Sequence, residues 1–225
     1  MRWEPLLLSL QIATIAMVAS LVLGTALAVL LGWKKLPARD LVDAIISTPL
    51  VLPPTVLGYY LFTTIGPTSA IGRAWHWLTG ADLVFTFKAA VIAATIGSLP
   101  LVVRAVRVGL DSVEPNVIAA ARTLGASPAR VLATVTLPLA GPGIAAGAML
   151  GFARALGDYG MTQVVAGSRF DGAGITNESP ASIYTYDQFI AGHDNAALAM
   201  AIATTVVGVT ILYFANRLTR RLHRV

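Results

Sequence analysis

Two charged residues, Arg154 and Asp158, lie nearest the interior of the long apolar stretches of this chain. They are four positions apart, so on a helix they share one face and can form an ion pair. Ionisable residues inside an apolar span are costly and commonly functional, and an arginine there can attract and orient an anion. An ion pair that merely ends a helix or braces a contact is the alternative interpretation.

Hydroxyl groups and prolines supply the other candidates for a polar path. Prolines break helical hydrogen bonds, and inside a membrane such breaks persist only beside protein or a watery cavity. A hydroxyl can donate to an oxyanion, although it can equally donate to a carbonyl of its own helix. For the prolines, a simple kink in a packed helix is the alternative. The candidate path residues are Pro53, Pro54, Thr55, Ser98, Arg154, Asp158 and Thr162.

The sequence excludes several other kinds of chemistry. It contains no cysteine, so thiol catalysis, disulfides and cysteine-based metal sites are absent. Its three histidines, His76, His193 and His223, show no metal-ligand spacing, and we expect neither a metal site nor catalytic residues. The phosphate-binding pattern GxxxxGK followed by Ser or Thr does not occur. We therefore expect no cofactor in this chain, and any ATP and Mg²⁺ that power it must be bound by another chain.

The composition indicates a protein whose surface faces lipid. Of the 225 residues, 56% are hydrophobic and 12% are charged, whereas a soluble domain usually has about 25% charged residues. A membrane helix needs about 20 mostly apolar residues. We therefore expect one all-α transmembrane domain over residues 1–225. Its expected spans lie at about 5–33, 44–66, 83–103, 131–158 and 195–216.

The first apolar stretch, 5–33, is too long for the apolar region of a secretory signal, so we expect it to be retained. It is also long enough to break into two segments, which would give six helices instead of five. The third apolar stretch, 83–103, is long enough to span the membrane if Lys88 extends its charged end to the lipid headgroups.

The basic residues are divided unequally between the loops that five spans would place on opposite sides. Eleven of the sixteen lysines and arginines fall in the segments 34–39 and 104–130 and in the tail after residue 216. By the positive-inside rule these segments are cytoplasmic, so we expect the N-terminus outside and the C-terminus inside the cell membrane. Topology thus accounts for the net charge of +5, and we expect no nucleic-acid partner.

The cytoplasmic loop at about 109–130 has the signals of two short helices joined by a turn. Pro115 is placed to open the first helix, which the alanines at 119–121 favour. Gly125 can end that helix in a left-handed turn, and Ser127 can open the next. An ordinary amphipathic connector lying on the headgroups is the alternative.

The stretch AARTLGASPARVLATVTLPLAGPGI, residues 120–144, resembles the EAA loop of ABC-importer permeases. That pattern is Glu-Ala-Ala, three residues, Gly, nine residues, Ile, one residue and Leu-Pro. This chain keeps the spacing, with Ala119 in place of the glutamate and Val135 in place of the isoleucine. The resemblance implies a coupling helix that docks on a separate ATPase subunit. The residues that it assigns to this contact are Ala119, Ala120, Ala121, Arg122 and Gly125.

Two further stretches, STPLVLPPTVLGYYLF at 47–62 and FARALGDYGMTQVVAG at 152–167, resemble the molybdate/tungstate permease family. The resemblance extends from about residue 5 to the end and implies the type I ABC importer permease fold. It implies import of molybdate or tungstate, with the related sulfate/thiosulfate permeases as the alternative. It also implies the partners, which are a second copy of the chain, two cytoplasmic ATPase subunits, an extracytoplasmic oxyanion-binding protein and membrane lipid.

Two functions of other classes compete with this interpretation. A passive anion channel would have no use for a docking loop, and co-purification of an ATPase would separate the two. An intramembrane enzyme needs acid, base or nucleophilic groups gathered at one depth, and Arg154 and Asp158 form the only deep charged pair. We therefore expect a transport subunit that is not itself an enzyme.

Overall fold

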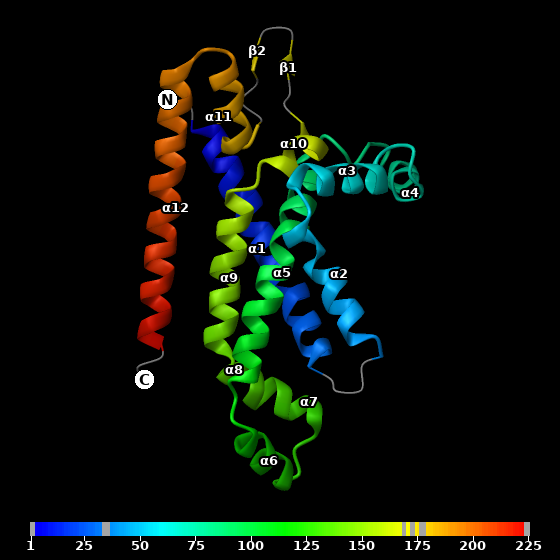
Figure 1. Ribbon diagram of the computed structural model, residues 1–225, viewed down its shortest axis with the longest axis vertical. Coiled ribbons are helices and arrows are strands. Elements are labelled where there is room, and N and C mark those ends of the chain that lie inside the picture. The colour runs from blue at the N-terminus through cyan, green and yellow to red at the C-terminus, as the bar shows by residue number, and fades with distance from the viewer. Residues whose placement is uncertain (1–2, 33–36, 168–169, 172–173, 176–178, 223–225) are drawn as a thin grey trace.

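The computed structural model describes residues 3–32, 37–167, 170–171, 174–175 and 179–222. Five long helical segments within this part of the chain run between two ends of the molecule (Figure 1). Their main helices are α1 (Glu4–Leu31), α2 (Arg39–Val51), α5 (Phe87–Asp111), α9 (Gly141–Leu156) and α12 (Asp194–Leu222). The expected all-helical membrane fold is confirmed.

The two ends of the molecule differ in what they carry (Figure 1). One end holds the short helix α6 (Pro115–Thr123) and the C-terminal end of α12, and we call it the α6 end. The opposite end holds α10 (Gly160–Ala166) and α11 (Ala181–Ile190), and we call it the α11 end. A two-residue antiparallel pair, β1 (Phe170–Asp171) with β2 (Gly174–Ile175), also lies there.

The first apolar stretch forms a single helix, α1, and is not broken into two segments. It is continuous from Glu4 to Leu31, with Pro5 in its first turn, where a missing N–H costs nothing. The expected end of this stretch at residue 33 lies outside the described residues. Three helices, α1, α5 and most of α12, are each long and apolar enough to cross a membrane, and counting each bent pair as one span gives up to five.

The second apolar stretch, 44–66, is not one straight helix. α2 ends at Val51, α3 (Pro54–Ile65) follows, and the two are bent by 116°. Pro53 and Pro54 lack N–H groups and so cannot continue the hydrogen-bond ladder of α2. As a result α3 runs across the α11 end toward α4 (Ala70–Thr79) instead of completing a straight crossing (Figure 1).

The core lies between α1, α5 and α9, where small residues let the helices approach closely. Ala13, Ala16 and Ala94 are fully or almost fully buried there. The closest approach joins α5 to α9, where a Cβ added to Gly109 would lie 2.8 Å from the Cα of Gly143. Packing of backbone against backbone is how membrane helices associate without a hydrophobic driving force.

The fourth apolar stretch, 131–158, is also bent. It begins as α7 (Pro128–Val131), continues through the π-helix η1 (Leu132–Thr136) and α8 (Leu137–Leu139), and bends by 68° before α9. Two prolines, Pro138 and Pro142, flank this bend and remove two donors from the ladder. α9 ends at Leu156, two residues before the expected end of the span.

The expected helix–turn–helix loop is present at the α6 end. α6 begins at Pro115, and the N–H groups of Gly125 and Ala126 donate to carbonyls of Arg122 and Ala121. Gly125 has φ +83°, the left-handed conformation that ends helices. The Ser127 hydroxyl then accepts the N–H of Arg130 and caps α7. α6 thus lies between the ends of α5 and α7 with its side chains largely exposed.

Candidate translocation site

Arg154 and Asp158 form the predicted ion pair at the α11 end. Nη1 of Arg154 lies 2.9 Å from Oδ1 of Asp158, and the two side chains are 27% and 2% exposed. Arg154 is in the last turn of α9, whereas Asp158 lies beyond the end of that helix. The pair therefore joins a helix to the turn that follows it, with the arginine partly open and the carboxylate enclosed.

Asp158 holds together the chain segments that meet at this turn. Its Oδ2 accepts the backbone N–H of Thr162 at 3.0 Å and the Thr162 hydroxyl at 2.7 Å. Its backbone carbonyl accepts the Ser182 hydroxyl of α11 at 2.9 Å. A carboxylate that accepts N–H groups at the first turn of α10 is stabilised by the helix dipole as well. Both carboxylate oxygens of Asp158 are thus engaged inside the protein.

The Arg154 side chain crosses α5 at a glycine. A Cβ added to Gly97 would lie 3.5 Å from Nη2 of Arg154, which is van der Waals contact, so the guanidinium lies directly beside this part of α5. Gly160, the first residue of α10, similarly meets α3, because its Cβ would lie 2.8 Å from the Cβ of Pro54. These two glycines allow α3, α5, α9 and α10 to converge around the ion pair.

A cavity of about 630 Å³ opens at this convergence. It brings together four of the predicted path residues from α3 and from the end of α9. Its lining residues are Pro54, Thr55, Arg154, Gly157, Asp158, Tyr159 and Gly160. A guanidinium has five N–H donors, so Arg154 can hold Asp158 and still donate to an anion in the cavity. The adjacent carboxylate balances its charge, so the cavity suits weak and reversible binding.

Tyr159 adds a neutral donor to the cavity wall. Burial raises the pKa of its phenol above the ordinary value, and the neighbouring Tyr186 and Asp187 raise the pKa further. Its ring packs against that of Tyr186 with 5.1 Å between centroids. The phenol therefore keeps its proton at neutral pH and can donate a hydrogen bond.

The structure places the other three predicted path residues outside the cavity lining. Ser98 is fully buried in α5 and donates to the carbonyls of Ala94 and Thr95, so its hydroxyl is used by its own helix. Thr162 is buried and donates to Asp158. Pro53 lies at the bend between α2 and α3. The roles of these three residues in the path stay predictions.

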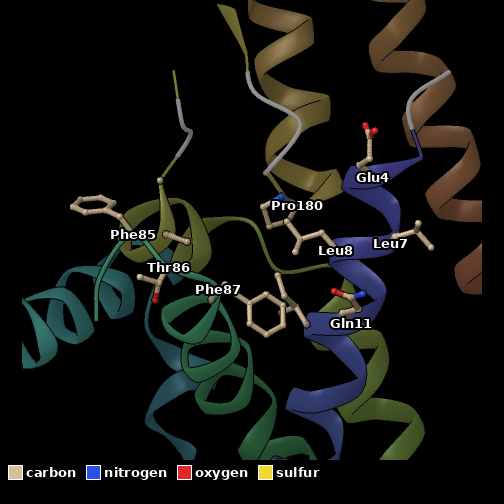
Figure 2. A pocket seen from close by; sticks show the side chains of 12 residues that line it. Glu4, Leu7, Leu8, Gln11, Phe85, Thr86, Phe87 and Pro180 are labelled. Atoms are coloured by element: carbon tan, nitrogen blue, oxygen red, sulfur yellow. The ribbon is translucent and has the colours of Figure 1, made fainter. Parts of the chain in front are cut away.

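A second cavity at the α11 end, of about 540 Å³, does not suit an oxyanion. It lies between α1 and the start of α5, where Leu8 and Phe87 line it from the two helices (Figure 2). Glu4 is the one ionisable group among its described lining residues, and the rest of the wall is mainly apolar. An acidic, apolar cavity repels anions, so we leave it outside the candidate path.

The residues assigned to ATPase coupling form an exposed surface at the α6 end. Ala119, Ala120 and Arg122 are exposed on α6, and Ala121 is half-buried. Leu124, directly after α6, is 89% exposed. Leu124 therefore adds an exposed apolar side chain to the surface of this loop.

Sequence reasoning missed the residues that shape the cavity without carrying charge. Gly97 on α5 and Ser182 on α11 come from distant segments, and only the fold brings them to Arg154 and Asp158. Tyr159 and Gly160 directly follow Asp158 and line the cavity. Tyr159 could have been predicted locally, because it directly follows the candidate Asp158 within the stretch 152–167 that resembles the permease family. Within the described residues, no three acidic or histidine side chains gather into a metal site.

A membrane protein of bent and straight helices, with a cavity beside an ion pair at one end and an exposed helical loop at the other, has the architecture of a transport permease. This chain belongs to the family of binding-protein-dependent transport system inner membrane components, which matches residues 9–224. It is therefore a multi-pass inner-membrane transport subunit. The resemblance to ABC-importer permeases is confirmed at the level of the family.

Individual relatives are similar in sequence to this chain over nearly its whole length. The molybdenum transport system permease protein ModB of Escherichia coli is 38% identical over 222 residues, which are 97% of this chain and 95% of the relative. ModB of Haemophilus influenzae is 36% identical over 217 residues, 96% and 93% of the two chains. In fold, the chain is similar to the MetNI methionine ABC transporter, with a TM-score of 0.74, 20% identity and coverage of 98% and 95%.

Proposed function

We propose that this chain is the transmembrane permease subunit of an ATP-driven importer for molybdate or tungstate. The observation that carries this proposal is the similarity, at 36–38% identity over more than nine-tenths of the chain, to relatives named as molybdenum transport permeases. Two copies of the chain would enclose the path, two cytoplasmic ATPase subunits would bind ATP and Mg²⁺, and an extracytoplasmic binding protein would deliver the oxyanion.

The cavity at Arg154 would receive the anion when the path opens outward. Molybdate, tungstate and sulfate are doubly negative tetrahedral oxyanions, and a guanidinium matches their oxygens with parallel N–H donors. Thr55 and Tyr159 line the same cavity and supply neutral donors. The pairing of Arg154 with Asp158 limits the affinity, which favours release in the next step.

The orientation follows from the positions of the basic residues. Arg122, Arg130 and Arg217 lie at the α6 end, where the C-terminal end of α12 also lies (Figure 1). By the positive-inside rule this end faces the cytoplasm, and the Arg154 cavity faces outward. The exposed α6 surface is then on the side where an ATPase would dock.

Uptake by the reconstituted complex tests the substrate. Vesicles containing this permease, its ATPase and its binding protein should accumulate labelled molybdate only when ATP is supplied. An equal excess of unlabelled tungstate should compete, and sulfate should compete far less. Uptake without ATP would show a passive channel, and preference for sulfate would assign the chain to sulfate/thiosulfate import.

Co-purification of the ATPase tests the docking surface. Leu124→Asp places a charge on the most exposed side chain after α6 and should abolish co-purification while leaving the permease folded. Leu78→Asp is the matched control, because Leu78 is 70% exposed on α4 at the opposite end. Retention of the ATPase by Leu124→Asp, or equal loss in both variants, would contradict docking at α6.

A further inference from the structure

Arg104 of α5 carries a positive charge that forms no ion pair with an acidic side chain in the described part of the chain. It is exposed and lies in the half of α5 nearer the α6 end. Its Nη2 donates to the Ser47 hydroxyl of α2 over 3.2 Å. No Asp or Glu of the described residues lies within ion-pair distance of Arg104. Arg104 directly follows the expected span 83–103, so its charge lies at the cytoplasmic end of that span.

Arg107, one turn further along α5, provides the contrast. Its Nη1 lies 3.3 Å from Oδ1 of Asp43 on α2, so its charge is balanced inside the protein. Both arginines come from α5 and both polar partners come from α2. Only Arg104 meets a hydroxyl instead of a carboxylate, and it is therefore the residue of the two that can bind an anion.

Arg104 also lies in line with the cavity described above. Seven residues separate it from Gly97, which is close to two helical turns, so both lie on the same face of α5. The Arg154 side chain crosses α5 at Gly97. Arg154 and Arg104 thus follow one another along one face, about 10 Å apart along the helix axis. Half-buried Leu101 lies between them on that face.

We propose that Arg104 and the Ser47 hydroxyl form a second oxyanion site, between the Arg154 cavity and the cytoplasm. The proposal rests on the proposed function, since the anion that leaves Arg154 is the one that Arg104 receives. The guanidinium offers parallel N–H donors to two oxygens, and the Ser47 hydroxyl can turn to donate to a third. Because Asp158 pairs with Arg154 and no acidic side chain of the described residues pairs with Arg104, the charge difference favours movement of the anion inward.

A single introduced thiol can report on this site, because the chain has no cysteine. Leu101→Cys places the thiol one turn from Arg104, at about 6 Å. The complex in lipid vesicles is treated with two thiosulfonate reagents, one bearing a sulfonate and the other a trimethylammonium group. At that distance in watery surroundings one charge changes each rate about threefold, in opposite directions. Arg104→Gln should therefore lower the sulfonate-to-trimethylammonium rate ratio about tenfold.

The controls separate this site from a structural role of the arginine. Arg107→Gln removes the same charge from the same helix, but six residues from the thiol, and should change the ratio less than about twofold. Arg104→Lys keeps the charge and should retain the ratio. Molybdate should slow the sulfonate reagent in the parent and in Arg107→Gln, and should have no effect in Arg104→Gln. An unchanged ratio in Arg104→Gln, or equal changes in both glutamine variants, would overturn the proposal.

A lipid phosphate has the same chemistry as the transported anion, so the vesicles are prepared with and without phosphatidylglycerol. If phosphatidylglycerol slows the sulfonate reagent and molybdate does not, the site holds a lipid headgroup and the proposal fails. ATP-driven uptake by the unmodified complex is measured separately. Uptake without any effect of molybdate on labelling rejects only this second site. An effect of molybdate without uptake supports the site and rejects the proposed function.

Discussion

Removal of the Asp158 carboxylate tests whether this residue organises the α11 end. Two hydrogen bonds from Thr162 reach a side chain that is only 2% exposed, and each is expected to contribute about 1.5 kcal/mol as a bond to a charged group. The ion pair with Arg154 is partly exposed and should add about 0.5 kcal/mol. Asp158→Ala should therefore cost about 3.5 kcal/mol of unfolding free energy, which corresponds to a decrease in Tm of roughly 7–14 °C.

A double-mutant cycle isolates the contact that carries this estimate. Thr162→Val removes only the hydroxyl bond and should cost about 1.5 kcal/mol. Adding Thr162→Val to Asp158→Ala should cost almost nothing more, because the bond is already lost. Scanning calorimetry of the purified permease in detergent measures each Tm. Asp82→Ala, which breaks an exposed pair with His76, is the control and should cost less than about 1 kcal/mol. Additive costs in the Asp158–Thr162 cycle would refute the reasoning.

Five other variants test the packing, the path and the loop. Gly109→Ala should lower the unfolding free energy by about 1–3 kcal/mol, because the added Cβ meets the α9 backbone. Gly141→Ala is the control and should not lower it, because the space around its Cβ is open. Equal Tm values for the two variants would contradict the contact. Ser98→Ala should leave molybdate uptake unchanged, because its hydroxyl is bonded within α5, while Thr55→Val should reduce uptake severalfold. Gly125→Val should destabilise the loop by about 1–3 kcal/mol, since φ +83° excludes a β-branched residue, and proteolysis of this loop should accelerate.

Local signals were sufficient for the α6 loop. Pro115 opens α6, Gly125 ends it with a positive φ, and Ser127 caps α7, each as its residue type predicts. The same holds for the pairing of Arg154 with Asp158, which depends on a separation of four residues. These features need only a few consecutive residues, so the sequence contains all the information.

The bends and the long-range contacts needed the fold. Hydropathy identified 44–66 and 131–158 as apolar, and the prolines marked possible breaks, but neither property gives the direction of a bend. The 116° turn brings α3 against α10, where Gly160 meets Pro54 from more than 100 residues earlier in the chain. Arg104 meets Ser47, 57 residues earlier in the chain, and no local pattern connects the two.

If α6 is the coupling helix, the contact between Gly109 and Gly143 would govern how its movement reaches the rest of the protein. The whole segment 110–142 leaves the helical body beside Gly109 and re-enters it beside Gly143, so its two attachment points touch. A pull on α6 therefore acts on α5 and α9 jointly and has little leverage to separate them. Arg104 on α5 and Arg154 on α9 would then be displaced together, as one rigid unit, against α2 and α3.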